Sequence, residues 1–463
     1  MTEKPKFVSL ANVDPVTTMA GTDYVYCLVG GSTKKIKLED LRQMMEQNQQ
    51  QFLDENAFWI EENVASSKGA AYVNTGGNEL VKLTWLSKIK GVLMDTNGNY
   101  TPLNPNNSNY TEDGDQVVKD GAVLAAYDKA DWMGIVEGGY WNYLQTIEIS
   151  GVTHIRHHIS LIPLPGGWYT EELPVGMFKC YIKDNKLRSI PFVQPAGSKT
   201  INAFFDLAQA RGKNFGLAGD PFRMFLNDYI YAKYGNRDVQ NLKAADGTKI
   251  FGCGLDGTET TTQTDGWQKF LRQCTIKTGA CLALGRNDGN VEVTDSDGNT
   301  CHSVNVSVFE NAYGQFWEMD GHVCSLDKAA DTFTWKGNWL PSGTPTADTF
   351  ANIPVIKVSR PTSDRSFNCD IALITDKGKQ YAAFIPTQDH TGISTGDSFW
   401  YGSGGQLWLR GGTSNNGSSC GLACSGSHNA WSASNASFSA RLDYHGGIKQ
   451  VTSAELKALL AAA

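Results

Sequence analysis

Short apolar stretches alternate with clusters of glycine, asparagine and serine along most of this chain, a pattern that predicts strands joined by turns. Near the C-terminal end, Leu407 to Leu409 forms one apolar strand pattern and Phe438 to Leu442 a second. Between them, residues 413–437 are rich in Ser, Asn, Gly and Ala, and have too few apolar side chains to build a core. Because apolar strands bracket this stretch, we interpret it as a long surface loop held at both ends.

The N-terminal pattern predicts a hairpin followed by a helix. Tyr24 to Val29 and Lys35 to Leu38 are strand-like, with the turn Gly30-Gly31-Ser32 before the second strand. From Leu38 to about Val64 the chain is polar and helix-compatible, and only one of its two heptad seam positions stays apolar. The segment is either a short oligomerisation stalk or a single amphipathic helix lying on a neighbouring domain.

The central part of the chain changes from strand to helix patterns. Residues 71–174 combine turn sequences with strand patterns at 143–149 and 153–162, which predicts a β-rich connecting domain. Residues 202–210 and 221–234 have apolar side chains at helical spacing, and Pro221 suits the first position of a helix.

The end of the chain carries a further helix signal. Thr452 and Glu455 form a capping-box sequence, which opens a short C-terminal helix. Strand and helix patterns in separate stretches together predict an α+β multidomain protein.

Composition narrows the class of protein. A length of 463 residues allows two to four domains, and 41% hydrophobic with 11% aromatic residues is typical of folded chains. The net charge is −8 and Lys and Arg do not cluster along the sequence, so we expect no nucleic-acid partner. No apolar run reaches membrane-spanning length, and Met1 to Pro5 lacks a secretory-signal pattern. We therefore expect a chain made in a cytoplasm, without membrane insertion.

Three groups of residues suggest metal chemistry, and none has a complete ligand pattern. The 10 cysteines are irregularly spaced, so most are predicted to be small buried side chains. His154 and His158 would lie ~13 Å apart along a strand, too far to share one ion, and with His157 they are predicted to be structural or exposed. Asp295 to Asn299 is similar to a calcium loop but lacks its bidentate Glu, which favours a hairpin turn.

Three blocks resemble one group of C-type-lectin-fold proteins. The block from Phe309 to Gly321 is similar to the group's Glu-Asn-x-x-Gly-x-x-Trp-Glu signature, and Tyr234 to Asp238 is similar to its aromatic-Gly turn. Arg410-Gly411-Gly412, a polar Asn-rich loop and Ala440-Arg441-Leu442 look like its C-terminus. The group contains formylglycine-generating-type enzymes and the variable receptor-binding proteins of phages and diversity-generating retroelements. The resemblance implies a C-type-lectin-like domain in which Glu310, Trp317 and Glu318 are core residues.

Enzymes of this group bind copper with a cysteine pair, and Cys420 and Cys424 occupy the corresponding loop. Here three residues separate the thiols instead of four, and the surrounding aromatic and basic residues are absent. A copper site needs its full set of ligands. We therefore predict no catalytic residue, metal or cofactor.

The N-terminal hairpin and helix resemble the attachment module of phage tail and fibre proteins. The expected organisation is an attachment module (1–37), a helical stalk (38–70), a β-rich connector (71–174), a C-type-lectin-like receptor-binding domain (175–447) and a C-terminal helix (448–463). The resemblance implies a virion protein, a tail fibre or receptor-binding protein, that binds a glycan or protein on the host surface. Residues 1–37 would bind other tail or baseplate proteins, and the chain would form a homo-oligomer, with a trimer favoured.

Aromatic side chains supply stacking area and polar ones adaptable hydrogen bonds in binding loops. The predicted receptor-binding residues are Trp400, Tyr401, Asn415, Asn416, Ser418, Ser419, His428, Asn429 and Trp431. Two alternatives stay open: a non-binding structural virion component such as a head fibre, collar or decoration protein, and a formylglycine-generating-type copper oxidase.

Overall fold

The computed structural model describes residues 24–29, 32–63, 74–236, 238–255, 266–327, 332–336, 356–359, 368–376, 379–387, 399–401 and 404–463. They form a mixed α+β structure, which confirms the predicted class. The chain divides into two compact units, Met1–Glu55 and Asn56–Ala463.

The first unit contains the predicted hairpin and helix. Strand β1 (Tyr24–Val29) pairs antiparallel with β2 (Ser32–Lys37), and helix α1 (Leu38–Asn56) follows directly. Along α1, Gln50 donates a hydrogen bond to Asp54 at 2.8 Å, a contact between side chains one turn apart.

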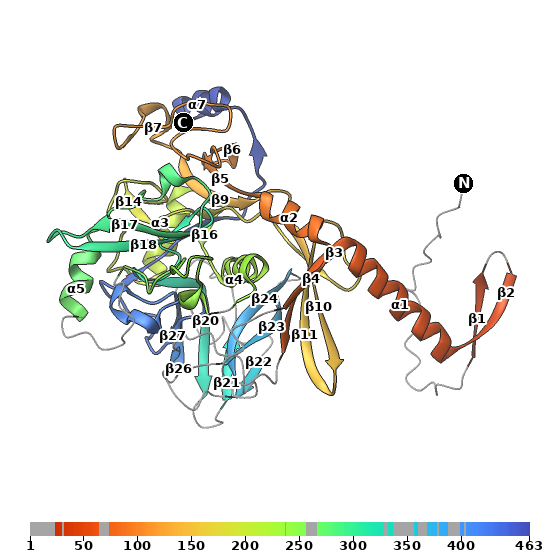
Figure 1. Cartoon of the computed structure of the whole chain (residues 1–463). Helices are drawn as coiled ribbons and strands as arrows, with labels where there is room; N and C mark the ends of the chain where they lie inside the picture. The colour runs from red at the N-terminus through yellow and green to blue at the C-terminus, as the bar shows by residue number, and fades with distance from the viewer. Residues whose placement is uncertain are drawn as a thin grey trace. The chain divides into compact units, whose positions relative to one another are not determined.

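Three larger sheets organise the second unit (Figure 1). The first, in spatial order, contains β12 (Trp168–Thr170), β10 (Tyr140–Ile149), β11 (Val152–Ser160), β3 (Ala57–Asn63) and β4 (Asn74–Gly77). The second contains β16 (Phe215–Leu217), β29 (Leu442–Tyr444), β13 (Val175–Gly176), β9 (Asp131–Val136), β5 (Ile89–Met94), β6 (Asn99–Pro102) and β30 (Lys449–Gln450). The third contains β22 (Ile356–Ser359), β21 (Thr332–Lys336), β20 (Trp317–Asp327), β26 (Gly404–Arg410), β27 (Ser425–Ser427) and β25 (Phe399–Tyr401), with β28 (Phe438–Ser439) pairing to β20.

Shorter paired strands complete the described elements. They are β7 (Val118–Lys119) with β8 (Ala122–Val123), β14 (Tyr181–Lys183) with β15 (Lys186–Arg188), β17 (Gly289–Thr294) with β18 (Thr300–Val306) and β19 (Phe309–Glu310), and β23 (Asn368–Asp376) with β24 (Lys379–Thr387). The helices are α2 (Glu79–Ser87), α3 (Ile201–Arg211), α4 (Asp220–Tyr234), α5 (Gly266–Gln273) and α7 (Ser453–Ala462), with short 3-10 turns at η1 (Ala125–Tyr127), η2 (Val239–Asn241), η3 (Leu282–Leu284) and η4 (Ser414–Ser419).

The predicted helix ends earlier than expected, so the helical stalk over 38–70 is wrong for residues 57–63, and residues 64–70 lie outside the described residues. The next residues form β3, an inner strand that pairs with β11 on one side and β4 on the other. Phe58 and Ile60 are buried at alternating positions, the spacing of a strand with one face in a core. Burial of these side chains in the second unit therefore overrides the local helix preference of the chain.

The expected boundary at 174/175 does not separate two domains. In the second sheet, Val175 of β13 pairs with Gly134 of β9 on one side and with Asp443 of β29 on the other. Strands from the predicted connector and from the predicted lectin-like domain thus share one hydrogen-bonded sheet and one compact unit. Sequence alone hides this pairing because the partners of Val175 lie 41 and 268 residues away along the chain.

The helices follow their sequence signals closely. α4 has Pro221 in its first turn and ends at Gly235 in the left-handed conformation (φ 60°), a usual helix stop. α7 starts with the predicted capping box, in which Glu455 accepts the Thr452 backbone N–H at 2.8 Å. The helix starts at Pro221 and at the capping box are confirmed, but the C-terminal helix predicted over 448–463 begins only at Ser453, because Lys449–Gln450 pair with β6 as β30.

Helix α4 lies at the centre of the second unit in Figure 1 and is buried along most of its length. Phe222 packs edge-on against Phe309 with ring centroids 4.8 Å apart, and Phe225 packs against Trp85 at 6.0 Å. These aromatic contacts join α2, α4 and β19, which come from both sides of the expected 174/175 boundary. The core is therefore continuous across it.

Fragments of the chain test this continuity. We expect a fragment starting at Asn56 to fold with the cooperative thermal transition of the full chain, because it keeps every sheet of the second unit. A fragment starting at Val175 loses β3, β5, β9 and β10 and is expected to be insoluble or unfolded. Circular dichroism melting of both fragments measures the difference; a cooperatively folded 175–463 fragment would contradict the shared sheet.

Candidate functional site

The strand before the predicted loop is an inner strand of the third sheet. Residues 407–409 of β26 are fully buried, as their apolar pattern predicts. Gly411 and Gly412 follow with φ angles of 79° and 67°, which favour glycine. A Cβ atom on Gly412 would lie only 2.6 Å from Cys420 Sγ, so a side chain has no room there. The two glycines turn the chain back into the protein.

The first half of the predicted loop is largely buried, not exposed. Asn416 Oδ1 accepts the Thr413 backbone N–H at 2.7 Å and the Thr413 hydroxyl at 2.9 Å, forming the cap of η4. Asn415 is half-buried and hydrogen-bonds to the same hydroxyl, while Ser419 is buried. Ser419 is therefore not the surface residue that the sequence predicted, whereas Asn415 and Asn416 are half-buried and their side-chain oxygens accept hydrogen bonds from Thr413.

The cysteine pair also lies within this buried half. A Cβ built on Gly412 would lie 2.6 Å from Cys420 Sγ and 3.2 Å from Cys424 Sγ, so both thiols converge on this glycine. The Cys420 thiol donates to the Thr413 carbonyl oxygen at 2.9 Å. In the described ranges, no cluster of three or more His, Cys, Asp or Glu side chains suits a metal ion. The two thiols pack as small buried side chains.

The second half of the loop forms the exposed segment, residues 428–436. His428 is exposed, and Asn429 and Trp431 are half-buried. The backbone holds the segment in place: the Leu407 N–H donates to the Asn429 carbonyl at 2.8 Å, and the Ser198 N–H donates to the Asn435 carbonyl at 3.0 Å. The segment is therefore an ordered surface feature with anchored ends.

Aromatic side chains meet beside the exposed segment. Trp400 of β25 is half-buried and packs edge-on against Trp317, with ring centroids 5.5 Å apart at 89°. A Cβ on Gly426 would lie 3.4 Å from His428 Nδ1 and 3.6 Å from Trp317 Cη2, so His428 lies close to the same tryptophan. Trp431 packs against the hydrophobic cluster that contains Trp317.

Of the nine predicted residues, Trp400 and His428 therefore lie beside Trp317, and Asn429 and Trp431 belong to the exposed segment that His428 begins. Asn415, Asn416 and Ser419 belong to the first half of the loop. The side chains of Tyr401 and Ser418 lie outside the described residues.

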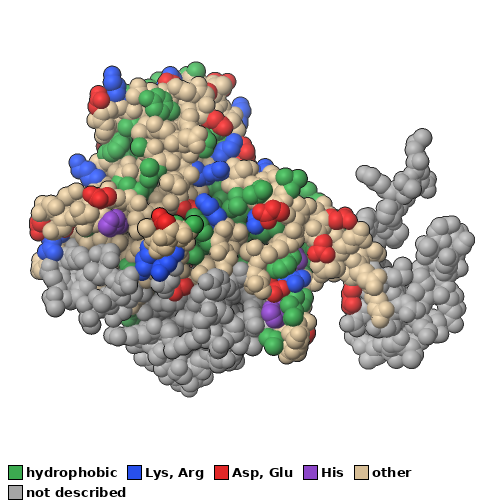
Figure 2. All heavy atoms as spheres, in the orientation of Figure 1, with side chains coloured by type: hydrophobic (Ala, Val, Ile, Leu, Met, Phe, Trp, Pro, Cys, Tyr) green, Lys and Arg blue, Asp and Glu red, His purple; other side chains and the backbone are tan. Residues whose placement is uncertain are grey.

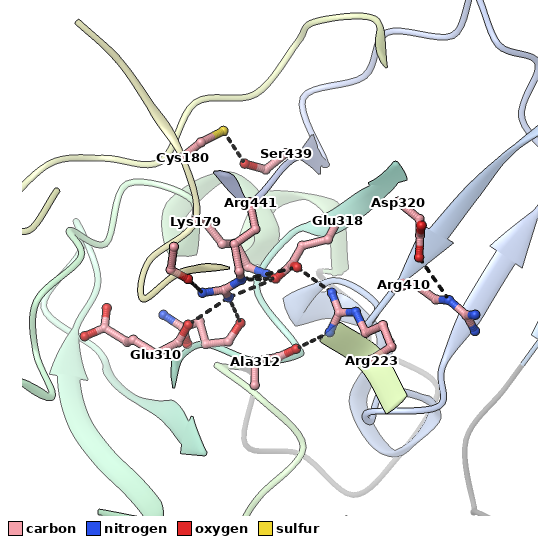
Figure 3. A network of polar contacts seen from close by, with 12 residues as sticks. Lys179, Cys180, Arg223, Glu310, Ala312, Glu318, Asp320, Arg410, Ser439 and Arg441 are labelled. Atoms are coloured by element: carbon pink, nitrogen blue, oxygen red, sulfur yellow. Dashed lines mark hydrogen bonds and ion pairs between the residues drawn. The ribbon is translucent and has the colours of Figure 1, made fainter. Parts of the chain in front are cut away.

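A buried charge network is centred on Glu318, the residue that follows Trp317 (Figure 3). Glu318 of β20 accepts hydrogen bonds from Arg441 at 2.9 Å, from Arg223 of α4 and from Lys179. Arg441 also donates to four backbone carbonyls, including that of Met177 at 2.8 Å. All four charged side chains are at most 5% exposed. The network joins four segments of the chain and fixes the strand that follows the exposed segment.

A second buried ion pair holds β26, the strand that precedes the loop 413–437. The Arg410 guanidinium donates to Asp220 at the start of α4 and to the Ser425 hydroxyl at 2.6 Å, and lies 4.5 Å from the Trp408 ring centroid. Arg410 and Arg441 come from the two sequence blocks that flank the loop. Each is therefore an internal anchor.

Burial and charge shift the pKa values in the network. Burial raises the pKa of Glu318, but Arg223, Arg441 and Lys179 outweigh it, so that carboxyl stays ionised far below its usual range. Burial lowers the pKa of Lys179 to about 8 despite the neighbouring Glu318. Glu310, whose carboxylate accepts the backbone N–H groups of Gly279 and Cys281 at 3.0 Å, has a pKa raised by burial. Glu310, Trp317 and Glu318 are therefore buried core residues, as the sequence predicted.

The three histidines of β11 are structural, in agreement with their prediction. Each is buried and contacts a different side chain: His154 with Glu61 at 3.2 Å, His157 with Asp228 at 2.9 Å and His158 with Gln145 at 2.9 Å. Burial lowers the pKa of His158 to about 3, so it is neutral at physiological pH.

The calcium-like sequence is the predicted hairpin turn. Between β17 and β18, Asp295 Oδ1 accepts the backbone N–H groups of Asp297 and Asn299, both at 2.9 Å. The turn Asp95 to Asn99 between β5 and β6 uses the same contacts. In each turn the aspartate satisfies the protein's own backbone.

Sequence reasoning missed one cluster of charged residues. Lys and Arg side chains from residues 129, 183–188 and 211–213 line a single cavity, although no Lys/Arg run exists along the chain. The spacing of Lys183, Lys186 and Arg188 around a hairpin turn was the available signal. The partner segments are brought beside it only by the fold.

A comparison of the chain with protein-family models and with curated proteins finds no match. In the part of the chain that the structure describes, no helix has the length and apolar character needed to cross a membrane.

Removing the central carboxylate tests the network. A Glu318→Gln change leaves three buried cations around a neutral side chain, and we expect it to destabilise the protein by ~3–5 kcal/mol, the usual cost of breaking a buried ion pair. The matched control is Glu79→Gln, which breaks the surface pair with Lys82 and should leave the melting temperature nearly unchanged. Equal melting curves for the two variants would show that the network is dispensable.

The lowered pKa of Lys179 should make the free energy of unfolding depend on pH. Its pKa is about 8 when folded and 10.5 as the ordinary value, so between these pH values the unfolded chain binds more protons than the folded one. The free energy of unfolding of the wild type, relative to Lys179→Met, should therefore rise with pH from about 8 to 10.5. Denaturant titrations of both proteins at several pH values measure this; a difference that is constant or falls with pH contradicts the assignment.

Proposed function

We propose that this chain is a phage virion protein, a tail fibre or receptor-binding protein, whose second unit has a C-type-lectin-like head that binds a host-surface glycan or protein. The head would bind through the exposed segment 428–436 and the adjoining Trp400. This region is narrower than the one expected from sequence, because Ser419 is buried and the side-chain oxygens of Asn415 and Asn416 bond to Thr413.

One observation carries the proposal: a short polar and aromatic segment lies at the surface while the chain on both sides of it is held by buried arginines. Before the segment, Arg410 donates to Ser425 of β27 at 2.6 Å, and after it Arg441 pairs with Glu318. A segment held this way presents side chains with little entropy left to lose on binding. Trp400 and Trp431 supply stacking area, and His428 and Asn429 supply hydrogen bonds, the division found in binding loops.

The sequence blocks that resemble C-type-lectin-fold proteins support the fold part of the proposal. Glu318 and Arg441 come from two of these blocks, and they are ion-paired in the core. The two blocks that resemble the same group of proteins in sequence are therefore also in direct contact in the structure.

The first unit would attach the head to the particle. Its hairpin and helix are the elements expected of an attachment module, and residues 1–37 would bind tail or baseplate proteins. A homotrimer would multiply individually weak receptor contacts through effective concentration. A non-binding structural role in the virion is the alternative that the adsorption experiment below separates from this proposal.

Changing the exposed segment should remove receptor binding without unfolding the protein. We expect His428→Ala combined with Asn429→Ala to reduce adsorption of the labelled full-length chain to host cells at least about tenfold, the loss typical of central interface contacts. The melting temperature should stay unchanged, because exposed polar side chains contribute little stability. Flow cytometry and thermal melting measure the two effects.

The matched control replaces the same residue types elsewhere, Asn106→Ala with His302→Ala, and should adsorb as the wild type does. Trp431→Ala is measured separately, since its half-buried ring also packs on the core. Wild-type adsorption by the His428 and Asn429 variant would exclude this surface as the receptor site. Absence of adsorption by the wild type itself would favour the non-binding structural role.

A further inference from the structure

A basic cavity lies in the second unit, lined by other residues than the proposed receptor surface. Its volume is about 590 Å³, within the range of small-molecule sites. Its basic lining residues are Lys129, Lys183, Lys186, Arg188, Arg211 and Lys213. The acidic side chains in the lining are Asp95 and Asp184. The cavity is therefore positive within a chain whose net charge is −8.

The surplus of positive charge is local. Figure 2 shows Lys and Arg side chains interspersed with Asp and Glu over the displayed face of the described residues. Of the two acids in the cavity, Asp95 already accepts backbone N–H groups of its own turn at 2.8 and 2.9 Å. Its carboxylate is therefore turned to the protein and not toward the lysines. Such a focused charge raises the local concentration of anions.

Two arginines in the cavity lining are preorganised by one buried carboxylate. Arg188 Nε donates to Asp131 Oδ1 at 2.8 Å, and Arg211 Nε donates to Asp131 Oδ2 at 2.6 Å. Their Nη2 groups donate to the carbonyls of Ala130 at 2.8 Å and Lys129 at 2.7 Å. Both arginines are at most 9% exposed. The guanidiniums are thus held in fixed orientations before any ligand arrives.

One carboxylate cannot neutralise two guanidiniums. Burial raises the pKa of Asp131, but Arg188 and Arg211 outweigh it, so its pKa lies below the ordinary value and it carries a single negative charge. In the described structure no hydrogen bond uses the Nη1 group of either arginine. Fixed guanidinium N–H groups with surplus charge are the donors that suit phosphate and carboxylate.

Neutral polar groups complete the lining. Thr96, Asn97 and Asn214 supply hydroxyl and amide groups, and Tyr444 supplies a phenol. Asn214 Nδ2 donates to the Tyr444 hydroxyl at 3.4 Å, which places both groups at the same wall. Hydroxyl and amide groups match the hydroxyls of a sugar, whereas an apolar ligand would find few apolar side chains among these residues.

We propose that this cavity binds an anionic sugar, a saccharide unit that carries a phosphate or a carboxylate group. The two arginines and the lysines around them would bind the charged group, and the asparagines, Thr96 and Tyr444 would bind the hydroxyls. This is a second ligand site, and it does not depend on the exposed segment 428–436 or on the proposed virion role.

Isothermal titration calorimetry of the full-length chain at low ionic strength tests the proposal, with glucose 6-phosphate, glucuronate, glucose and inorganic phosphate as probes. We expect glucose 6-phosphate or glucuronate to bind at least about tenfold more tightly than glucose and than inorganic phosphate, because only an anionic sugar uses both kinds of lining group. Binding should weaken as salt is added.

Variants locate the site. Lys183→Ala with Lys186→Ala removes two charges from the β14–β15 hairpin and should weaken anionic-sugar binding about tenfold with the melting curve unchanged. The charge-matched control, Lys119→Ala with Lys243→Ala, removes two lysines outside the cavity and should bind as the wild type does. Arg211→Met should abolish binding, but it also removes one of the two arginines that pair with buried Asp131 and can therefore destabilise the fold. The lysine-pair variant is therefore the decisive one.

Three results would overturn the proposal. The first is equal binding of the anionic sugars by the lysine-pair variant and the wild type. The second is inorganic phosphate or glucose binding as tightly as the anionic sugars. The third is tighter binding of a thymidine oligonucleotide that the lysine-pair change abolishes, which would make the cavity a nucleic-acid site.

Discussion

The contact on which this structure most depends is the buried carboxylate of Glu318 with three cations around it. Its partners come from α4, from the strand after the exposed segment and from the stretch before β14, so one side chain joins segments up to 262 residues apart, from Lys179 to Arg441. Charges buried this deeply are stable only while all of them are present. Arg410, on the neighbouring strand β26, forms a second buried ion pair with Asp220. Together they hold the chain on both sides of the loop.

This arrangement explains why a stretch with so few apolar residues is ordered. The backbone of residues 413–427 bonds partly within the loop, through Thr413 and Asn416, and partly to β25 and β26 through β27. Leu409 and Phe438 supply apolar burial at the ends of the loop. Only residues 428–436 then remain at the surface. The ion pairs of Arg410 and Arg441 already hold the chain on both sides of this segment. A receptor that binds the segment, as we propose, would therefore not have to order it.

Sequence patterns identified local elements and missed long-range ones. The α4 start at Pro221, the α7 capping box and the Asp295 turn were predictable because their signals lie within a few residues. Trp59 lies in β3 but falls in the stretch predicted to be helical. Only the pairing of this stretch with β11 and β4 makes it a strand, and that pairing cannot be predicted from the local sequence. The division at 174/175 failed for the same reason. The basic cavity was invisible because Lys129, Arg188 and Arg211 meet through a shared contact with Asp131 or its neighbouring backbone.

We propose that residues 428–436, and not residues 413–427, contact a host receptor. Hydrogen–deuterium exchange of the full-length chain, alone and mixed with host cell envelopes, measures this directly. We expect slower exchange at residues 428–436 when envelopes are present. We expect no change at residues 413–427, whose amides should already exchange slowly in the free protein. Slowed exchange confined to other parts of the chain, or rapid exchange at 413–427 in the free protein, would contradict it.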